Sequence, residues 1–178
     1  MAAGDVPNAM PNDAPDAARV GGARVVGLIS DTHGLLRPEV FDALAGVELI
    51  LHAGDVGPRH LLAELEAIAP VRAVSGNTDP LGAAWLAESV EVEVGGLRVR
   101  VQHGHELGRP NPERVWAAYQ GADVCVYGHT HKQVVWRGPD GRLVVNPGAA
   151  GHRRFDLVPC VARLTVAGGR AEAELVEL

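Results

Sequence analysis

The sequence predicts an α/β fold in which two β-sheets pack face to face with helices on the outside. In the first half, short apolar runs alternate with segments of helical spacing, a pattern typical of parallel strands joined by right-handed crossovers. In the second half, paired strand-like segments flank turns that contain glycine, which indicates hairpins. The chain has 178 residues, 47 % of them hydrophobic and 21 % charged, which suits one compact domain.

The first half should contain three strands and two helices in alternation. Pro38 suits the first turn of a helix, because the backbone N–H that it lacks would have no partner there. The second helix carries leucines at helical spacing and ends before Pro70. The expected strands are 24–30, 47–53 and 71–75, and the expected helices are 38–44 and 58–68.

The second half should contain three hairpins, one helix and one further buried strand. Gly95-Gly96 and Gly168-Gly169 each separate two strand-like segments, as turns do in hairpins. The hairpins are expected at 89–94 with 97–102, 133–136 with 143–145, and 160–166 with 171–176, the helix at 111–120 and the strand at 123–127.

Composition indicates how the chain is divided into domains and where in the cell the protein is expected. Residues 1–22 are rich in Ala, Pro, Asn and Asp without an apolar period, so we expect a disordered tail before a single domain at 23–178. The start of the chain has no secretory signal, and no apolar run approaches the roughly 20 residues of a membrane span. Cys125 and Cys160 stand among apolar residues and should be core fillers. The cytoplasm is therefore the expected location.

Charge and histidine content bear on function. The formal net charge is −6, which disfavours an extended surface for nucleic acid. The chain has eight histidines, most of them next to Asp, Gly or another His. His52 ends a buried strand and should be a core residue, whereas His60 opens a helix and should be exposed.

Polar clusters follow five of the predicted strands. Loops at the carboxyl ends of strands gather at one edge of an α/β sheet, so these clusters should meet. Each cluster alone is most often a turn, but five in order favour a common site. In Asp31-x-His33 and His129-x-His131, extended backbone would point both side chains the same way. The clusters are Asp31-Thr32-His33-Gly34, Gly54-Asp55, Gly76-Asn77-Thr78-Asp79, His103-Gly104-His105 and Gly128-His129-Thr130-His131.

The side-chain types in these clusters point to divalent metals. Imidazole, carboxylate and amide groups suit Mn, Fe, Zn, Co or Ni. The clusters contain no cysteine, which argues against a structural zinc site. Their ligands outnumber what one ion with an open coordination position requires, so two ions sharing a bridging carboxylate fit better.

The ordered run DTHG, GD, GNTD, HGH, GHTH and NPG resembles the calcineurin-like metallophosphoesterases, most of all their small single-domain bacterial and archaeal branch. The resemblance extends from Arg24 to about Phe155. It implies a four-layer αββα sandwich of two mixed sheets and a centre of two divalent ions, with manganese as the first choice. It also implies that Asp31, His33 and His131 bind the first ion, that Asn77, His103 and His129 bind the second, and that Asp55 bridges both.

Two positions depart from the family pattern. Thr78 stands where many larger relatives carry a His that can protonate the leaving group, and Ala149 stands where Ser usually follows Asn-Pro-Gly. We therefore expect activity to favour good leaving groups, or His105 to supply the proton. A role for His105 as a hydrogen-bond partner of a metal ligand is an equally good interpretation. Asp79 is a second candidate at the site, for which we favour an orienting role.

The charge of the expected centre predicts its chemistry. Two divalent ions outweigh two carboxylates, so the site should attract a phosphate, and a hydroxide bridging the ions should attack phosphorus in line. The sequence therefore predicts a dinuclear phosphohydrolase whose substrate is a small phosphodiester. A phosphomonoesterase or nucleotide phosphatase on the same site, and a non-catalytic protein-binding scaffold of the same fold, remain alternatives. A homo-oligomer is compatible with the sequence.

Overall fold

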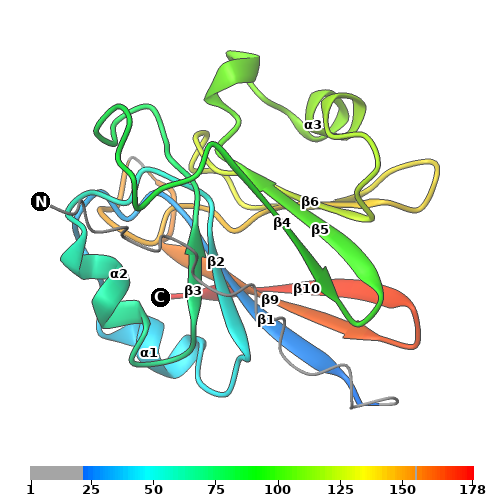
Figure 1. The fold of residues 1–178 in the computed structure, drawn as a ribbon, viewed down its shortest axis with the longest axis horizontal. Helices are drawn as coiled ribbons and strands as arrows, with labels where there is room; N and C mark the ends of the chain where they lie inside the picture. Colours follow the sequence, from blue (N-terminus) through cyan, green and yellow to red (C-terminus); the bar gives the residue numbers. More distant parts are fainter. Residues whose placement is uncertain (1–21, 155) are drawn as a thin grey trace, which may run out of the picture.

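The computed structural model describes residues 22–154 and 156–178, which form two β-sheets with short helices outside them (Figure 1). The tail expected at 1–22 lies, except for Gly22, outside the described residues, and the domain limits stay a prediction. The first sheet contains β1 (Arg24–Ile29), β2 (Leu49–His52), β3 (Val71–Ala73), β9 (Cys160–Ala167) and β10 (Arg170–Glu177).

The second sheet is formed by the middle of the chain. It contains β4 (Ser89–Val94), β5 (Leu97–Gln102), β6 (Val124–Val126), β7 (Val134–Arg137) and β8 (Leu143–Asn146). The helices are α1 (Glu39–Ala43), α2 (His60–Leu65), the 3₁₀ helix η1 (His105–Leu107) and α3 (Pro112–Ala118).

Both sheets are mixed. The first has the order β10-β9-β1-β2-β3, in which β1, β2 and β3 are parallel and the hairpin β9–β10 is antiparallel to β1. The second has the order β4-β5-β6-β8-β7, in which β5, β6 and β8 are parallel and β4 and β7 are antiparallel edge strands. The parallel crossovers and the three hairpins predicted from the sequence are confirmed.

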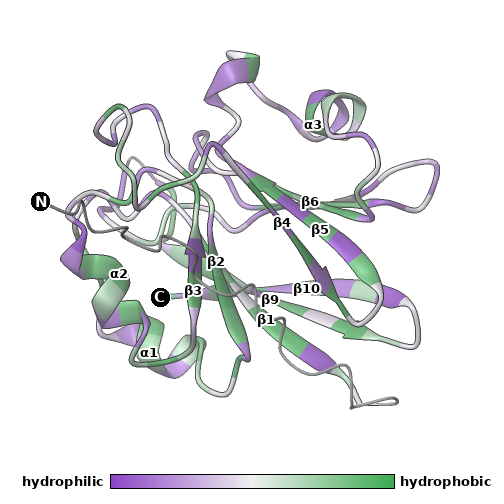
Figure 2. Ribbon diagram, in the orientation of Figure 1, coloured by the Kyte–Doolittle hydropathy of each residue, from purple (hydrophilic) through white to green (hydrophobic). Residues whose placement is uncertain are grey.

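Buried apolar residues separate the layers. One cluster draws on both sheets, with Leu28 and Leu51 from the first and Val99 and Val126 from the second, so it fills the space between them. A second cluster lies between the first sheet and the helices α1 and α2, and a third packs α3 onto the second sheet. Hydrophobic segments run along strands of both sheets in Figure 2. The four-layer sandwich is therefore the observed architecture (Figure 1).

The helices are shorter than the apolar spacing suggests. The expected helix 58–68 is α-helical only at His60–Leu65. Beyond Leu65 the amide of Ile68 bonds to the carbonyl three residues back, as in a 3₁₀ turn, so the apolar spacing continues while the helix tightens and ends. None of the helices within the described residues is long and apolar enough to cross a membrane.

Strand register brings the polar clusters to one level. Ile29 of β1 is paired with His52 of β2, which is paired with Ala73 of β3, so the three following loops start side by side. In the second sheet, Val101 is paired with Val126, which starts the loops after β5 and β6 at a common level. The amide of Asp31 donates to Gly54, and the amide of Gly128 donates to His103, which extends both pairings into the loops.

Gly151 allows its own backbone to pack closely against the backbone of the loop after β1. A Cβ atom at this position would lie 2.1 Å from the carbonyl oxygen of Thr32. Because that oxygen belongs to backbone, we expect Gly151→Ala to lower the free energy of unfolding by about 1–3 kcal/mol. Gly22→Ala, where a Cβ meets nothing within 4 Å, is the control and should leave it unchanged. Urea denaturation of both variants measures the difference, and equal midpoints would contradict the expectation.

Candidate metal centre

The loops after the strands bring the predicted ligands together. Two groups of acidic and imidazole side chains have ligand atoms within 4.8 Å of one another, and Asp31 belongs to both. The first group contains Asp31, His33 and His131, and the second contains Asp31, Asp55 and His103. Asn77 and His129 lie against the second group through His103. All seven side chains that the sequence singles out therefore converge on one region.

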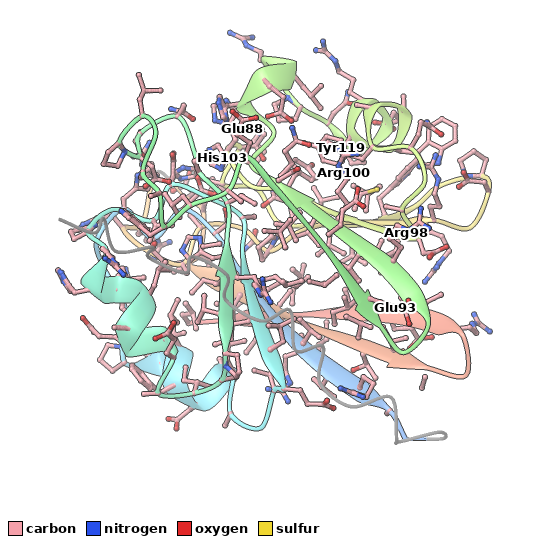
Figure 3. All side chains as sticks on the ribbon, viewed as in Figure 1. Glu88, Glu93, Arg98, Arg100, His103 and Tyr119 are labelled. Atoms are coloured by element: carbon pink, nitrogen blue, oxygen red, sulfur yellow. The ribbon has the colours of Figure 1, made fainter. Side chains whose placement is uncertain are left out.

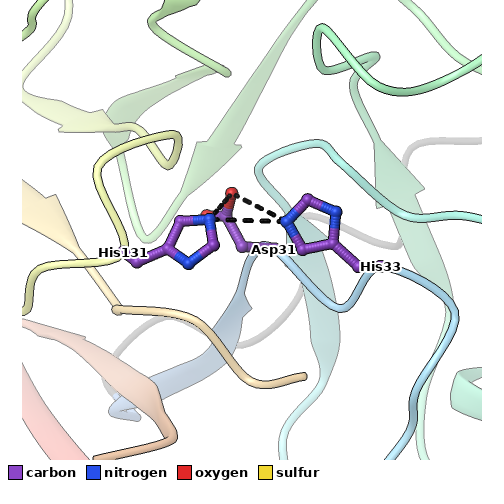
Figure 4. Close-up of side chains that lie close together, drawn as sticks. All are labelled: Asp31, His33 and His131. Atoms are coloured by element: carbon purple, nitrogen blue, oxygen red, sulfur yellow. Dashed lines mark hydrogen bonds and ion pairs between the residues drawn. The ribbon is translucent and has the colours of Figure 1, made fainter. Parts of the chain in front are cut away.

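Figure 4 shows the close approach of Asp31, His33 and His131 in the first group, in which one carboxylate oxygen of Asp31 has no hydrogen bond. Its Oδ2 accepts from the hydroxyl of Ser30 at 2.6 Å and from the amide of His129 at 3.1 Å. Its Oδ1 is buried and lies 3.2 Å from Nε2 of His131 and 3.9 Å from Nε2 of His33. A buried carboxylate oxygen without a partner is costly, so this arrangement suits a cation.

Asp55 belongs to the second group and also lies close to the first. Its Oδ2 is 3.8 Å from Nε2 of His33, in the first group, and 3.5 Å from Nε2 of His103, in the second. Its Oδ1 accepts a hydrogen bond from the backbone amide of Thr78 at 2.9 Å, which fixes the orientation of the carboxylate. Burial alone would raise the pKa of Asp55, but hydrogen bonds from His103 and Thr78 lower it well below its ordinary value.

The Nε2 atom of His103 faces two oxygen atoms. Its Nδ1 donates to the carbonyl of Ala53 at 2.6 Å, so Nε2 faces Asp55 Oδ2 and, at 3.2 Å, Asn77 Oδ1. A proton or a metal cation bound at Nε2 would make both contacts favourable. Burial lowers the pKa of His103, but the hydrogen bond to Asp55 and the charges of both aspartates raise it above its ordinary value. The surroundings of this ring therefore favour positive charge.

His129 completes the second group from the loop after β6. Its ring centroid lies 5.3 Å from that of His103, and its backbone amide bonds to Asp31. Burial and the neighbouring His103 lower the pKa of His129, which favours the neutral imidazole that metal binding requires. Burial has the same effect on the pKa of His33.

The backbone of the site is strained at the predicted ligands. Among the described residues, the non-glycine positions with positive φ are Asp31, His33, Asp55, His129 and His131, at 53°, 45°, 54°, 65° and 59°. Left-handed backbone costs an L-residue about 1–2 kcal/mol, and such strain clusters at functional sites. The expected extended backbone in Asp31-x-His33 and His129-x-His131 is therefore wrong. Tight left-handed turns, rather than strand alternation, aim these side chains into the site.

His52 connects the loop after β1 to the loop after β2. It is fully buried, as predicted, and burial lowers its pKa to about 4. Its Nδ1 accepts from the amide of Gly54 at 3.2 Å, so its Nε2 donates to the hydroxyl of Thr32 at 2.9 Å, which in turn donates to Val56. The sequence identified His52 only as a core residue. Its link between the loops after β1 and β2 depends on the parallel pairing of those strands.

A second supporting network, which sequence reasoning missed, holds the loop after β5. Glu106 accepts from the amide of Gly104 at 3.0 Å and from the hydroxyl of Tyr119 at 2.6 Å. The guanidinium of Arg100 lies 5.3 Å from the centre of the Tyr119 ring, and both residues are labelled in Figure 3. Burial and the carboxylate of Glu106 raise the pKa of Tyr119, which keeps it a donor.

The two further candidates from the sequence differ in their surroundings. Asp79 is buried, and its carboxylate oxygens accept from the amides of Gly57 at 3.0 Å and Gly76 at 2.8 Å, an arrangement that orients two loops. The side chain of His105 is 40 % exposed, and its ring centroid lies 5.3 Å from that of His103. His105 therefore lies at the rim of the site, where a substrate could reach it.

Comparison with known proteins identifies the family of the chain. Residues 25–169 match the calcineurin-like phosphoesterase superfamily domain. The chain is 38 % identical over 159 residues to a probable metallophosphoesterase of Methanothermobacter thermautotrophicus, covering 85 % of this chain and 91 % of that protein. It is 30 % identical over 141 residues to a phosphodiesterase of Methanocaldococcus jannaschii, covering 69 % and 82 %. The chain belongs to the calcineurin-like phosphoesterase superfamily.

Solved structures show the same fold. The structure of Vacuolar Protein Sorting 29 from Cryptosporidium parvum superimposes with a TM-score of 0.70 at 25 % sequence identity. The match covers 88 % of this chain and 98 % of that one. The sandwich described above is therefore shared with this protein over nearly its whole length.

The low pKa of His52 makes stability depend on pH. The folded state keeps His52 neutral down to about pH 4, whereas the unfolded chain takes up a proton near pH 6.5. The stabilisation is complete above pH 6.5 and is lost as the pH falls toward 4. The loss is on the order of 3 kcal/mol. In chelator-treated protein, His52→Gln should flatten the profile of unfolding free energy over this range. Parallel profiles for the two proteins would contradict the assignment.

Proposed function

We propose that the protein is a dinuclear metal-dependent phosphodiesterase. The observation that carries the proposal is the convergence of carboxylate and imidazole ligand atoms around Asp31 and Asp55, where Oδ1 of Asp31 is buried without a hydrogen bond. Asp31, His33 and His131 would hold one ion, Asn77, His103 and His129 the other, and Asp55 both. Imidazole, carboxylate and amide donors without thiolate favour Mn²⁺, with Fe, Zn, Co or Ni as substitutes.

The side chains of the protein would orient the metal ions and the substrate, and the ions would supply Lewis acidity. When bound, two divalent ions would lower the pKa of coordinated water toward neutrality and neutralise charge on the phosphoryl group. Asp31 and Asp55 are the only carboxylates of the proposed ligand set, so the occupied centre remains cationic and attracts an anionic substrate. The supporting bonds to Ser30, Thr78 and Ala53 hold the ligands in place before the metals arrive.

The position of Thr78 bears on the choice of substrate. Its hydroxyl lies 3.4 Å from Nδ1 of His33, and its amide bonds to Asp55, so it positions ligands. A threonine hydroxyl is too weak an acid to protonate a leaving group efficiently, and His105 at the rim is the proposed proton donor. A phosphodiester is the proposed substrate because a relative at 30 % identity is named a phosphodiesterase. A monoester on the same centre remains the alternative.

Removal of the bridging carboxylate should abolish activity. With Mn²⁺ and bis(p-nitrophenyl) phosphate, Asp55→Asn should lower kcat/KM by about 10³-fold or more, because both ions lose a ligand. Asn preserves the side-chain volume and tolerates left-handed backbone, so the variant should fold. His60→Ala is the control, since the His60 side chain is 71 % exposed. Hydrolysis at the background rate with every metal named above would contradict the proposal.

Metal content should follow the assignment of ligands. The protein loaded with Mn²⁺ and then desalted should carry two ions per chain by inductively coupled plasma mass spectrometry. His131→Ala should carry about one, because the remaining ligands of the second ion are intact, and His60→Ala should carry two. A single ion in the unaltered protein would show that the centre is mononuclear.

A protein-binding scaffold is the second candidate function, supported by the likeness to Vacuolar Protein Sorting 29. The filled ligand positions argue against it, since a scaffold has no need of a strained acceptor cluster. Hydrolysis of bis(p-nitrophenyl) phosphate separates the two functions. A scaffold would hydrolyse it only at the background rate and would keep its binding partner in the Asp55→Asn variant.

A further inference from the structure

A cavity of about 430 Å³ opens beside the candidate metal centre. The segment from Gly108 to Pro112 forms one side, and Thr130 to Val134 contribute to the other. His129, one of the proposed metal ligands, also lines it, so the cavity and the centre are continuous. Its volume lies within the range of small-molecule pockets, which begins at about 300 Å³.

The wall of the cavity is apolar and rigid. Pro110, Pro112, Val134 and Tyr127 supply flat or branched hydrocarbon surface. Tyr127 is buried, and burial raises its pKa to about 12, so its ring carries no charge at neutral pH. The backbone is fixed by the two prolines and by the side chain of Asn111, which accepts from the amide of Arg114 at 2.9 Å and caps α3. A preformed apolar wall suits a planar ring.

The cavity is cationic in a chain that is acidic overall. Arg109 and Lys132 line it and are exposed, and none of the described residues around it is a carboxylate. The formal net charge of the chain is −6, and Lys132 is its only lysine. Two free cations above an apolar wall favour a ligand that carries both a ring and an anionic group.

We propose that this cavity binds one ester arm of the substrate, and that this arm is a planar ring bearing a further negative charge. The inference rests on the phosphodiesterase function proposed above and names its substrate class. With the phosphoryl group at the centre, the arm leaves past His129 and packs against Pro110, Tyr127 and Val134. Arg109 and Lys132 then pair with the anionic group at the outer end of the ring.

The test is direct binding of three phosphonates, which present the same phosphoryl oxygens and cannot be hydrolysed at the P–C bond. Isothermal titration calorimetry on the Mn²⁺-loaded protein compares methylphosphonate, phenylphosphonate and 4-carboxyphenylphosphonate. The phenyl compound should bind at least fivefold more tightly than the methyl compound, because only its ring fills the cavity. The carboxyphenyl compound should gain a further threefold or more.

Variants assign the two gains to the cavity. Lys132→Ala should remove most of the gain from the carboxylate without changing the affinity for methylphosphonate. Val134→Asp, which introduces a carboxylate beside the ring, should remove the gain from phenyl. Arg72→Ala is the matched control, since Arg72 is an exposed cation on β3, outside the cavity.

The outcomes separate the two proposals. Equal affinity for the three phosphonates, or an unchanged preference in both cavity variants, would overturn the assignment of the cavity and leave the phosphodiesterase function standing. Failure of all three to bind, together with background hydrolysis of bis(p-nitrophenyl) phosphate, would overturn the function itself and the inference that rests on it.

Discussion

The main constraint on the site is a concentration of buried acceptor atoms that a bound cation would stabilise. Asp31 Oδ1 faces two imidazole nitrogens without a hydrogen bond, and Asp55 Oδ2 lies between His33 and His103. Burying such atoms together costs free energy through desolvation and mutual repulsion, and the left-handed backbone at five of the seven proposed ligands adds to that cost. A chain with this site gains stability when metal binds, because binding relieves the repulsion.

The surrounding sandwich offsets that cost, because hydrogen bonds join its loops to each other as well as to the strands. Parallel register starts the loops of each sheet at one level, and His52 joins the first two through Gly54 and Thr32. Two glycines also allow the loops around the site to pack closely. A Cβ on Gly76 would lie 2.1 Å from Asp55 Oδ1, and one on Gly128 would lie 2.0 Å from the Ser30 hydroxyl. Glycine is needed there for space, at φ values that other residues also adopt.

The candidate metal centre and the cavity beside it would have separate roles in a hydrolase. In the proposed function, the acceptor atoms that would hold metal ions set the reaction class. The segment from Gly108 to Pro112 and the single lysine at 132 belong to surface loops, where sequence can change without disturbing the metal ligands. The residues that line the cavity and the proposed metal ligands overlap only at His129, so other substitutions in the cavity would leave the proposed ligands in place.

The order of strands and helices, the hairpins and the identity of the converging side chains were predictable from the sequence, since apolar periodicity and polar clusters are local signals. The pairing of β9 with β1, which closes the first sheet, is not local, because it joins segments more than 130 residues apart. The left-handed turns at Asp31 and His131 were also out of reach, and alternation predicted extended backbone there. Tertiary contacts override local preference at a site, where packing on both sides of a loop fixes a conformation that the residue alone disfavours.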